Sequence, residues 1–271
     1  MSESKSYFNL KGKVAVVTGA MGLLGQHHCL ALSNAGANVV VTDLDEVGSR
    51  DFASHLPNKS LGIGADITSE NDVTKLKQKV MDKFGKIDIL VNNAAINDMI
   101  EKENSNPEMS KFENYSVDSF RAVIEVNVIG MFNCSKILGS VMAQNNYGSI
   151  INIASTYGIV APDQSLYLKP DGSRSFYKSP AYPTSKGAVI SFTKYLAAYW
   201  GEKGVRVNCL TPGGVDNNQE EYFNNNYSKR TPLKRMAIPE DYHGAVIFLA
   251  SDASAYMTGA NLVVDGGWTI W

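Results

Sequence analysis

Two side chains suited to proton transfer lie four positions apart in the segment AYPTSKG, at Tyr182 and Lys186. Residues at i and i+4 share one face of a helix, so a helix that begins near this segment places the phenol beside the ammonium. A phenol titrates near pH ~10, and a nearby ammonium favours phenolate and lowers that pKa. The pair predicts a tyrosine that works as a general acid and base near neutral pH. Tyr-x-x-x-Lys alone is equally typical of an ordinary helix surface.

A second candidate for chemistry is the glycine-rich segment VVTGAMGLLG. Gly19, Gly22 and Gly25 recur every three positions between a β-branched run and a helical pattern. Glycines at such a turn let the backbone approach a pyrophosphate, whose charge is then stabilised at the helix N-terminus. The spacing predicts a nucleotide site, and a plain strand-to-helix turn is the alternative.

The next β-branched run ends at Asp43, followed by Leu44. A carboxylate at this position accepts hydrogen bonds from the adenosine ribose hydroxyls and repels a 2′-phosphate, and Leu44 supplies no base for that phosphate. Both residues favour NAD over NADP, although a solvated turn aspartate is the alternative. Further candidate cofactor contacts end the following two runs: Asp66, Ile67, Asn93, Ala94 and Ala95.

These candidates lie at the ends of short apolar runs that alternate with helical patterns. The runs are 13–19, 38–45, 61–67, 87–95, 148–155, 205–214 and 260–267, and the helical patterns are 25–36, 69–84, 117–145, 182–203 and 239–251. Most runs are apolar almost throughout, which is typical of strands covered on both faces of a parallel sheet. We expect an α/β fold: one Rossmann-like domain over 1–271, with a doubly wound parallel sheet of about seven strands and helices on both faces.

Three irregular segments follow strand-like runs directly, at 97–116, 161–180 and 216–236. Ligands of open α/β sheets bind beyond the carboxyl ends of the strands, so we expect these insertions to face the site. Their polar composition predicts a polyhydroxylated or charged substrate. The basic side chains that could meet a phosphate or carboxylate are Lys169, Arg174, Lys178, Lys229 and Arg230. For any one of them, a solvated loop charge is the favoured interpretation.

Composition limits the partners. The 271 residues carry a net charge of −2, so no basic surface for nucleic acid is expected. The three cysteines are widely spaced, the N-terminus has no apolar core, and no apolar run approaches the length of a membrane span. These features predict a cytoplasmic protein with reduced thiols. His27 and His28 are expected to pack on the first helix, and no metal site is expected.

Two further residues complete a recognisable set: Ser155, which ends the fifth run, and Asn127 in IEVNVIG. With the glycine turn, Asp43, Asp66, NNAA, YPTSK, TPGG and VVDGG, the chain from about 10 to 267 resembles the short-chain dehydrogenases/reductases of the single-domain NAD type. The long insertion before Tyr182 is also similar to that of oxidoreductases of bacterial surface-sugar biosynthesis.

The resemblance implies a role for each catalytic residue. Tyr182 would be the general acid and base, Ser155 would hydrogen-bond the reacting oxygen, and Lys186 would bind the nicotinamide ribose and depress the tyrosine pKa. Asn127 would hold a water that relays protons through Lys186. Additional cofactor contacts would be Leu23, Leu24, Pro212, Gly213 and Val215, with Tyr157 and Gly214 joining Ser155 and Tyr182 at the substrate.

The implied activity is NAD(H)-dependent interconversion of a secondary alcohol and a ketone on a sugar-like substrate, by a homodimer or homotetramer. The chain departs from the family pattern at Leu23, where a glycine is usual, and at Val215 and Asp216, where a threonine is common. One alternative is a 3-oxoacyl-thioester reductase that uses NADPH, which Asp43 and the polar insertions oppose. The other is a non-catalytic NAD-binding regulator, which the complete catalytic set opposes. Within the 161–180 insertion, the side chains expected to select the substrate are Tyr167, Lys169, Arg174 and Tyr177.

Overall fold

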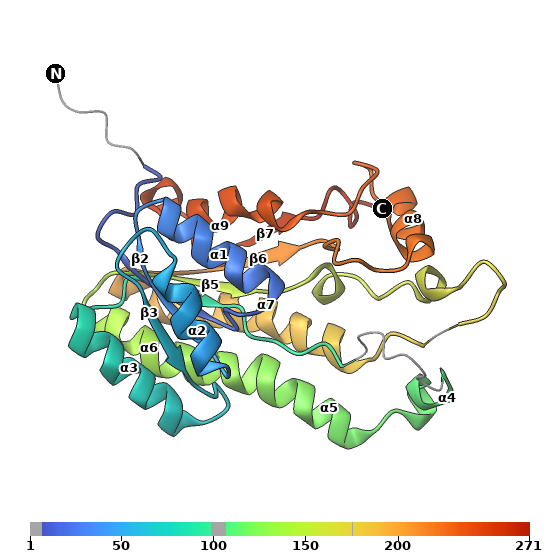
Figure 1. The fold of residues 1–271 in the computed structure, drawn as a ribbon, viewed down its shortest axis with the longest axis horizontal. Coiled ribbons are helices and arrows are strands. Elements are labelled where there is room, and N and C mark those ends of the chain that lie inside the picture. The colour runs from blue at the N-terminus through green and yellow to red at the C-terminus, as the bar shows by residue number, and fades with distance from the viewer. Residues whose placement is uncertain (1–6, 99–106, 175) are drawn as a thin grey trace.

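One parallel sheet organises the chain. The computed structural model describes residues 7–98, 107–174 and 176–271, and its seven strands are ordered β3-β2-β1-β4-β5-β6-β7 (Figure 1). Every neighbouring pair is parallel. The strands are β1 (Val14–Thr18), β2 (Asn38–Asp43), β3 (Leu61–Gly64), β4 (Ile89–Asn92), β5 (Gly148–Ile153), β6 (Val205–Pro212) and β7 (Asn261–Val264). The predicted doubly wound α/β sheet is confirmed.

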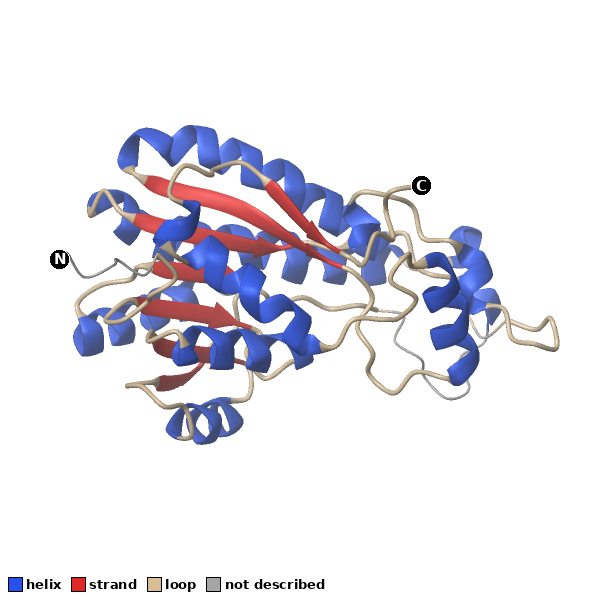
Figure 2. Cartoon of the chain, turned by 90° about the horizontal axis from the view of Figure 1, so that it is seen from above, coloured by secondary structure: helices blue, strands red, loops and turns tan. Residues whose placement is uncertain are grey.

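Helices cover both faces of this sheet (Figures 1 and 2). On one face α3 (Glu70–Phe84), α6 (Met131–Gln144) and α7 (Ala181–Trp200) contribute to one apolar cluster, and on the other α1 (Leu23–Asn34) and α9 (His243–Ala250) contribute to a second. Along β1, Val14 and Val16 join the first cluster while Ala15 and Val17 join the second. Successive side chains of a strand point to opposite faces, so burial of both faces explains the continuous apolar runs.

The strand order reverses beside β1, which pairs with both β2 and β4. Ligand sites of open α/β sheets form at such a switch point, outside the carboxyl ends of the strands. α4 (Pro107–Ser110), α8 (Glu221–Arg230) and the short turn Gln164–Tyr167 belong to the three insertions. Figures 1 and 2 place α4 and α8 beyond the carboxyl ends of the strands, on the side expected for a substrate.

Two predicted boundaries need correction. The segment 216–236 was expected to be weakly structured, but it contains α8, whose first turn carries Glu221 and whose last turn carries Lys229 and Arg230. This charge distribution complements the helix dipole. The sequence patterns also missed α2 (Glu46–Ser54), which begins where the Asp45 side chain accepts a hydrogen bond from Gly48 N at 2.9 Å. Residues 99–106 of the first insertion lie outside the described residues.

The predicted helix at 117–145 is continuous but not uniform. It comprises α5 (Val117–Ile124), a π-helical segment (Glu125–Gly130) and α6. Within the described residues, Val117–Gln144 is the one helical stretch long and apolar enough to cross a membrane by length and composition, with 56% of its most apolar window buried. Packing against α3 and α7 accounts for the apolar composition of this stretch.

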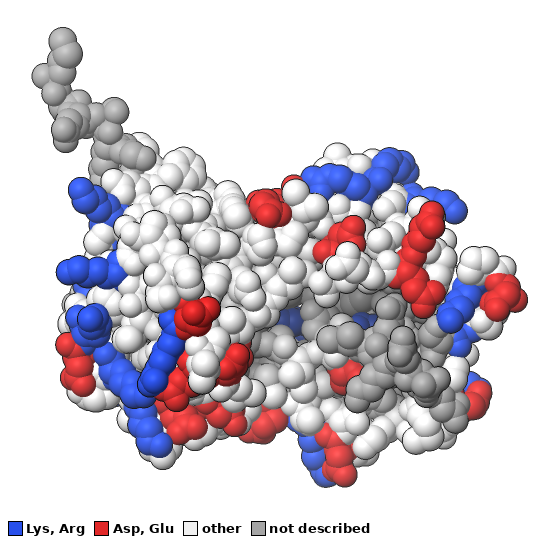
Figure 3. Space-filling view, in the orientation of Figure 1, with Lys and Arg blue, Asp and Glu red and all other residues white. Residues whose placement is uncertain are grey.

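The remaining elements are short. They are the turns Phe112–Asn114, Thr156–Gly158, Gly201–Lys203, Pro239–Tyr242 and Asp252–Ser254. On the face shown in Figure 3, basic and acidic side chains are interspersed, as the near-zero net charge suggests.

Candidate active site

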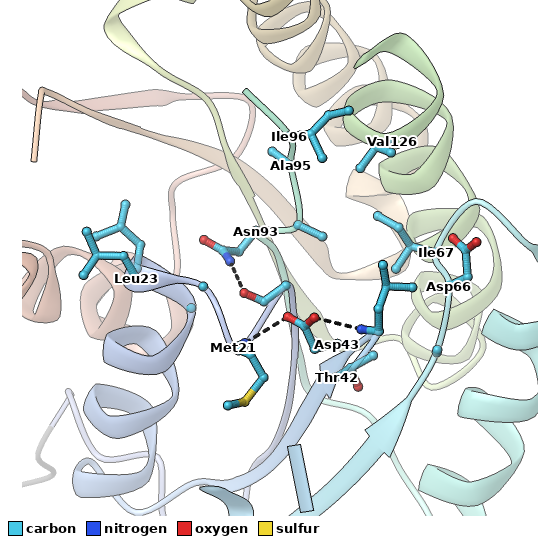
Figure 4. A pocket seen from close by; sticks show the side chains of 17 residues that line it. Met21, Leu23, Thr42, Asp43, Asp66, Ile67, Asn93, Ala95, Ile96 and Val126 are labelled. Carbon is cyan, nitrogen blue, oxygen red and sulfur yellow. Dashed lines mark hydrogen bonds between the residues drawn. The ribbon is translucent and has the colours of Figure 1, made fainter. Parts of the chain in front are cut away.

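A cavity of about 540 Å³ opens at the carboxyl ends of the first four strands (Figure 4). It brings together every residue that the sequence assigned to the adenosine and pyrophosphate side of a cofactor. These are Gly19, Gly22, Leu23, Leu24, Gly25, Asp43, Leu44, Asp66, Ile67, Asn93, Ala94 and Ala95. The cavity is also lined by residues that no sequence motif indicated: Met21, Thr42, Ala65, Ile96 and Val126.

The glycine turn has no room for larger side chains. Gly19 has φ +61°, and a Cβ there would lie 2.5 Å from Ala94 Cα. A Cβ on Gly25 would lie 2.1 Å from the carbonyl oxygen of Gly19. Helix α1 begins after Gly22 without a side-chain cap, so its first backbone N–H groups are available to an anion. This arrangement fits the pyrophosphate of a dinucleotide.

Asp43 is fixed by the turn that it faces. Its carboxylate accepts hydrogen bonds from Met21 N at 2.9 Å and Leu44 N at 2.8 Å (Figure 4). A carboxylate has about four acceptor positions, so the side chain can still accept from ribose hydroxyls. Asn93 ties the end of β4 to the same turn, because its amide donates to the carbonyl oxygens of Thr18 and Gly19 at 3.0 and 2.9 Å.

A second cavity of about 480 Å³ continues from the first, since Leu23 and Leu24 line both. It contains all four predicted substrate residues, Ser155, Tyr157, Tyr182 and Gly214. Pro212, Gly213 and Val215, assigned to the nicotinamide, line it as well. A ligand held here would therefore lie between the hydroxyls of Ser155 and Tyr182 and the residues predicted to contact the nicotinamide.

Tyr182 lies in the first turn of α7, and Lys186 follows one turn later. Lys186 Nζ is 5.6 Å from the centre of the Tyr182 ring and donates to Ile153 O at 2.8 Å. Lys186 is buried and lines neither cavity. The Ser155 hydroxyl accepts a hydrogen bond from Tyr157 N at 3.2 Å, which orients it at the end of β5. The structure thus brings Ser155, Tyr182 and Lys186 together as predicted.

The pKa of Tyr182 departs from the sequence-based prediction. Burial raises the pKa of this phenol above its ordinary value, and a hydrogen bond with Ser155 offsets the rise only in part. Lys186 is also buried, which lowers the pKa of its own ammonium to about 8. Desolvation disfavours the charged form of each group and is the largest cause of both pKa shifts. The prediction of a lowered tyrosine pKa is therefore wrong in this structure.

Asn127 lies in the π-helical segment and is buried. Its side-chain oxygen accepts from Ile96 N at 2.8 Å, and its amide nitrogen donates to Ile96 O at 3.0 Å and to Ser185 Oγ at 3.0 Å. Irregular π turns inside helices are frequent at functional sites. The contacts tie the end of β4 to the helix that carries Tyr182 and Lys186, while the water-holding role stays a prediction.

The wall of the second cavity is more aromatic than the composition of the insertions suggested. Tyr167, Phe176, Phe223 and Tyr227 line it together with Tyr157. The hydroxyl oxygens of Tyr157 and Tyr167 form a hydrogen bond of 3.1 Å. The Tyr227 hydroxyl accepts a hydrogen bond from Gly214 N at 2.6 Å. The aromatic residues of SLY, SFY and EEYFNNNY were the signal that could have indicated this wall. Hydroxyl groups, amide groups and the Lys178 side chain supply its polarity.

The five candidate basic residues differ in whether they line the second cavity. Lys178 is buried in the second cavity, so its favoured interpretation as a solvated loop charge is wrong. Lys169, Arg174, Lys229 and Arg230 do not line that cavity. Arg174 stacks on Tyr177, which also lies outside the lining, and of the four expected selecting side chains Tyr167 alone lines the cavity.

The histidines of α1 take a packing role. His28 is fully buried, and desolvation together with His243 and His27 lowers its pKa to about 3. His27 Nδ1 lies 3.2 Å from His243 Nε2. Within the described part of the chain, no group of three potential metal-ligating side chains occurs.

Known proteins are similar to this chain over nearly its whole length. A family model described as enoyl-(acyl carrier protein) reductase matches residues 19–269. A short chain dehydrogenase/reductase of Aspergillus oryzae is 34% identical over 98% of both chains, and D-threitol dehydrogenase of Mycolicibacterium smegmatis is 32% identical over 97% of this chain and 95% of its own. The solved gluconate 5-dehydrogenase from Burkholderia cenocepacia, in complex with NADP and tartrate, is 29% identical with a TM-score of 0.85 over 98% of both chains. The chain belongs to the short-chain dehydrogenase/reductase family.

Proposed function

We propose that the chain is an NAD-dependent oxidoreductase that interconverts a secondary alcohol and a ketone on a polyhydroxylated, sugar-like substrate. The observation that carries this proposal is the shared cavity in which Ser155 and Tyr182 meet Pro212, Gly213 and Val215. Similarity to a D-threitol dehydrogenase and a gluconate 5-dehydrogenase supports a polyol or sugar-acid substrate class.

The choice of NAD rests on this chain's own residues. The Asp43 carboxylate would accept hydrogen bonds from the adenosine ribose and repel the 2′-phosphate of NADP, and Leu44 offers that phosphate no cation. When bound, the nicotinamide would exchange a hydride with the substrate carbon. The similar gluconate 5-dehydrogenase was solved in complex with NADP, so similarity alone does not favour NAD. The choice of NAD therefore depends on the Asp43 carboxylate.

The protein would supply orientation and proton transfer. Ser155 Oγ would donate to the reacting oxygen while it accepts from Tyr157 N. Tyr182 would take the hydroxyl proton during oxidation and return it during reduction. Lys186, buried beneath the tyrosine ring, would favour the phenolate when it is formed. Asn127 positions α7 through Ser185.

Two alternatives predict different outcomes. A 3-oxoacyl-thioester reductase would use NADPH. The match to a family model described as enoyl-(acyl carrier protein) reductase is consistent with a substrate of the acyl class. Asp43 opposes it, as do the side chains of Asn97, Lys178 and Gln219 in the cavity. A non-catalytic regulator has no need for the complete set of Ser155, Tyr182 and Lys186.

The test is a panel of alditols, sugar acids, sugar phosphates and acyl thioesters, each assayed with NAD(H) and NADP(H) by cofactor absorbance. Turnover of a hydroxy compound with NAD supports the proposal. Turnover of an acyl thioester with NADPH supports the first alternative, and cofactor binding without any turnover supports the regulator. Turnover of a sugar derivative of surface-sugar metabolism would support the resemblance to oxidoreductases of bacterial surface-sugar biosynthesis.

We also propose a homo-oligomer, a dimer or tetramer, in the reducing cytoplasm. Three large aromatic side chains are exposed on adjoining helices: Phe132 on α6, and Tyr195 and Tyr199 on α7. Phe192 links them, with ring-centre distances of 6.1 Å to Phe132 and 6.4 Å to Tyr195. Exposed apolar patches of this kind are typical of protein interfaces. The three cysteines are buried and unpaired, in keeping with reduced thiols.

A further inference from the structure

The second cavity has a single charged lining residue, Lys178, among the described residues. The other polar side chains that the structure describes along it are hydroxyls and neutral amides, with no carboxylate among them. A cavity with one cation and no acidic side chain attracts an anionic ligand and disfavours a cationic one.

Lys178 is held in place by its surroundings. It is 8% exposed. Its backbone N donates to Gln164 Oε1 at 2.9 Å, and its carbonyl oxygen accepts from Gln164 Nε2 at 3.1 Å. These bonds fix the last residues of the insertion against its first turn. The ammonium is therefore presented to the cavity by an ordered backbone.

The charge of this ammonium is incompletely compensated. Lys178 Nζ donates to Asn97 Oδ1, and it can offer three hydrogen bonds in total. Asp98 is the nearby acid and attracts the ammonium, but its oxygens accept hydrogen bonds from Ser179 Oγ at 2.6 Å and from Tyr115 OH rather than from Lys178. No carboxylate of the described segments forms an ion pair with Lys178. Buried charges are costly unless they are paired, so a ligand anion would complete this site.

The ammonium also lies beside the proposed reaction centre. Lys178 Nζ is 5.0 Å from the centre of the Tyr182 ring, and both residues line the same cavity as Ser155. An anionic group only a few bonds from the reacting carbon would reach this ammonium. The charged group of the substrate is thus expected near the oxidised or reduced carbon.

We propose that Lys178 binds the carboxylate of the substrate, which makes the substrate a polyhydroxy acid rather than a neutral polyol. This inference rests on the proposed function and names its substrate class. A carboxylate is a monoanion that one ammonium can pair, whereas phosphate sites favour arginine forks or several cations. The neutral amides of Asn97, Asn217 and Gln219 suit the hydroxyl groups of the remaining chain.

The test compares acids with alditols of equal length: threonate with threitol, and gluconate with glucitol, each assayed with NAD. Wild type should show the higher kcat/KM for the acid of each pair. Lys178→Gln should lower kcat/KM for the acid by roughly tenfold to a hundredfold, mostly through KM, and lower it far less for the alditol. Lys178→Arg should retain part of the preference. Lys169→Gln, in the same insertion but outside the cavity lining, is the control.

Binding separates this inference from the proposed reaction. Calorimetric titration of the enzyme–NADH complex with each acid and alditol should show tighter binding of the acid, and Lys178→Gln should abolish that difference. If no panel compound is turned over but the acids still bind through Lys178, the proposed reaction fails while the anion site stands. Equal binding of acid and alditol by wild type would overturn the inference. So would an equal loss for both in Lys178→Gln, which would give Lys178 a role on Tyr182 instead.

Discussion

The Lys178 ammonium lies 5.0 Å from the centre of the Tyr182 ring, and the Lys186 ammonium lies 5.6 Å from the same point. The phenol proposed to move the proton is thus flanked by two buried cations that come from different parts of the chain. Lys186 belongs to the same helix as the tyrosine, whereas Lys178 lies near the end of the 161–180 insertion. Several measurable properties follow from this arrangement.

The first prediction concerns stability and pH. Burial lowers the pKa of Lys178 to about 8, although the Asp98 carboxylate raises it. Between this value and its unfolded value near ~10.4, the unfolded chain binds more protons than the native state, so this lysine makes stability rise with pH. Below that window the cost of the buried charge is fully present. The unfolding free energy of wild type relative to Lys178→Met should therefore increase from pH 7 to pH 10.5, by on the order of 3 kcal/mol.

Chemical denaturation at both pH values measures this difference. Lys169→Met, which alters a less buried lysine of the same insertion, should show no comparable change with pH. A difference between wild type and Lys178→Met that stays constant across the window would contradict a lowered Lys178 pKa.

The second prediction concerns cofactor choice. Asp43→Asn removes the negative charge that faces the ribose while keeping a similar shape. The ratio of kcat/KM for NAD to that for NADP should fall by at least roughly tenfold, because the 2′-phosphate is no longer repelled. Asp45→Asn, at the exposed cap of α2, should leave the ratio unchanged. A wild-type enzyme that already prefers NADP would refute the argument from Asp43.

The third prediction concerns the glycine turn. Gly19→Ala places a Cβ 2.5 Å from Ala94 Cα at a residue with φ +61°, so the turn and the end of β4 must shift. We expect a loss of about 1–2 kcal/mol or more in stability and a marked loss of NADH affinity. Thermal unfolding and NADH fluorescence titration measure the two effects. Gly201→Ala, where an added Cβ meets nothing within 4 Å, is the matched control. Unchanged NADH affinity in Gly19→Ala would argue against a pyrophosphate at this turn.

The fourth prediction concerns assembly. If the aromatic patch of Phe132, Tyr195 and Tyr199 is an interface, Tyr195→Glu should reduce the mass measured by light scattering, because charge is excluded from interface centres. Tyr256→Glu changes an even more exposed tyrosine elsewhere and should leave the mass unchanged. A monomeric wild type at assay concentrations would rule out the interface.

The strands were predictable from the sequence because each is buried on both faces. Alternate residues of β1 join opposite apolar clusters, so Val or Ala occupies each of positions 14–17. Helix α2 was missed because its position depends on a distant contact: Gly62 of β3 lacks a side chain, and a Cβ there would meet Arg50 N at 2.3 Å. No local pattern at 46–54 conveys that fit.

The candidate site was predictable where spacing alone decides geometry. Four positions on a helix place Lys186 near Tyr182, and strand ends bring Asp43 and Ser155 to one edge of the sheet. Burial was not predictable in the same way. The tyrosine pKa is raised by desolvation, and Lys178 is enclosed by partners from distant segments, Asn97 and Gln164. Such environments arise from tertiary contacts between insertions rather than from local sequence.

The most direct test of the central claim is the turnover of Tyr182→Phe. With the best hydroxy compound of the panel and saturating NAD, this variant should lose at least roughly a hundredfold in kcat, because it lacks the hydroxyl proposed to exchange the proton with the substrate. NADH binding, followed by fluorescence, should remain close to that of wild type, and the exposed Tyr195→Phe on the same helix should be fully active. Turnover by Tyr182→Phe at the wild-type rate would contradict the assignment of Tyr182 as the acid and base.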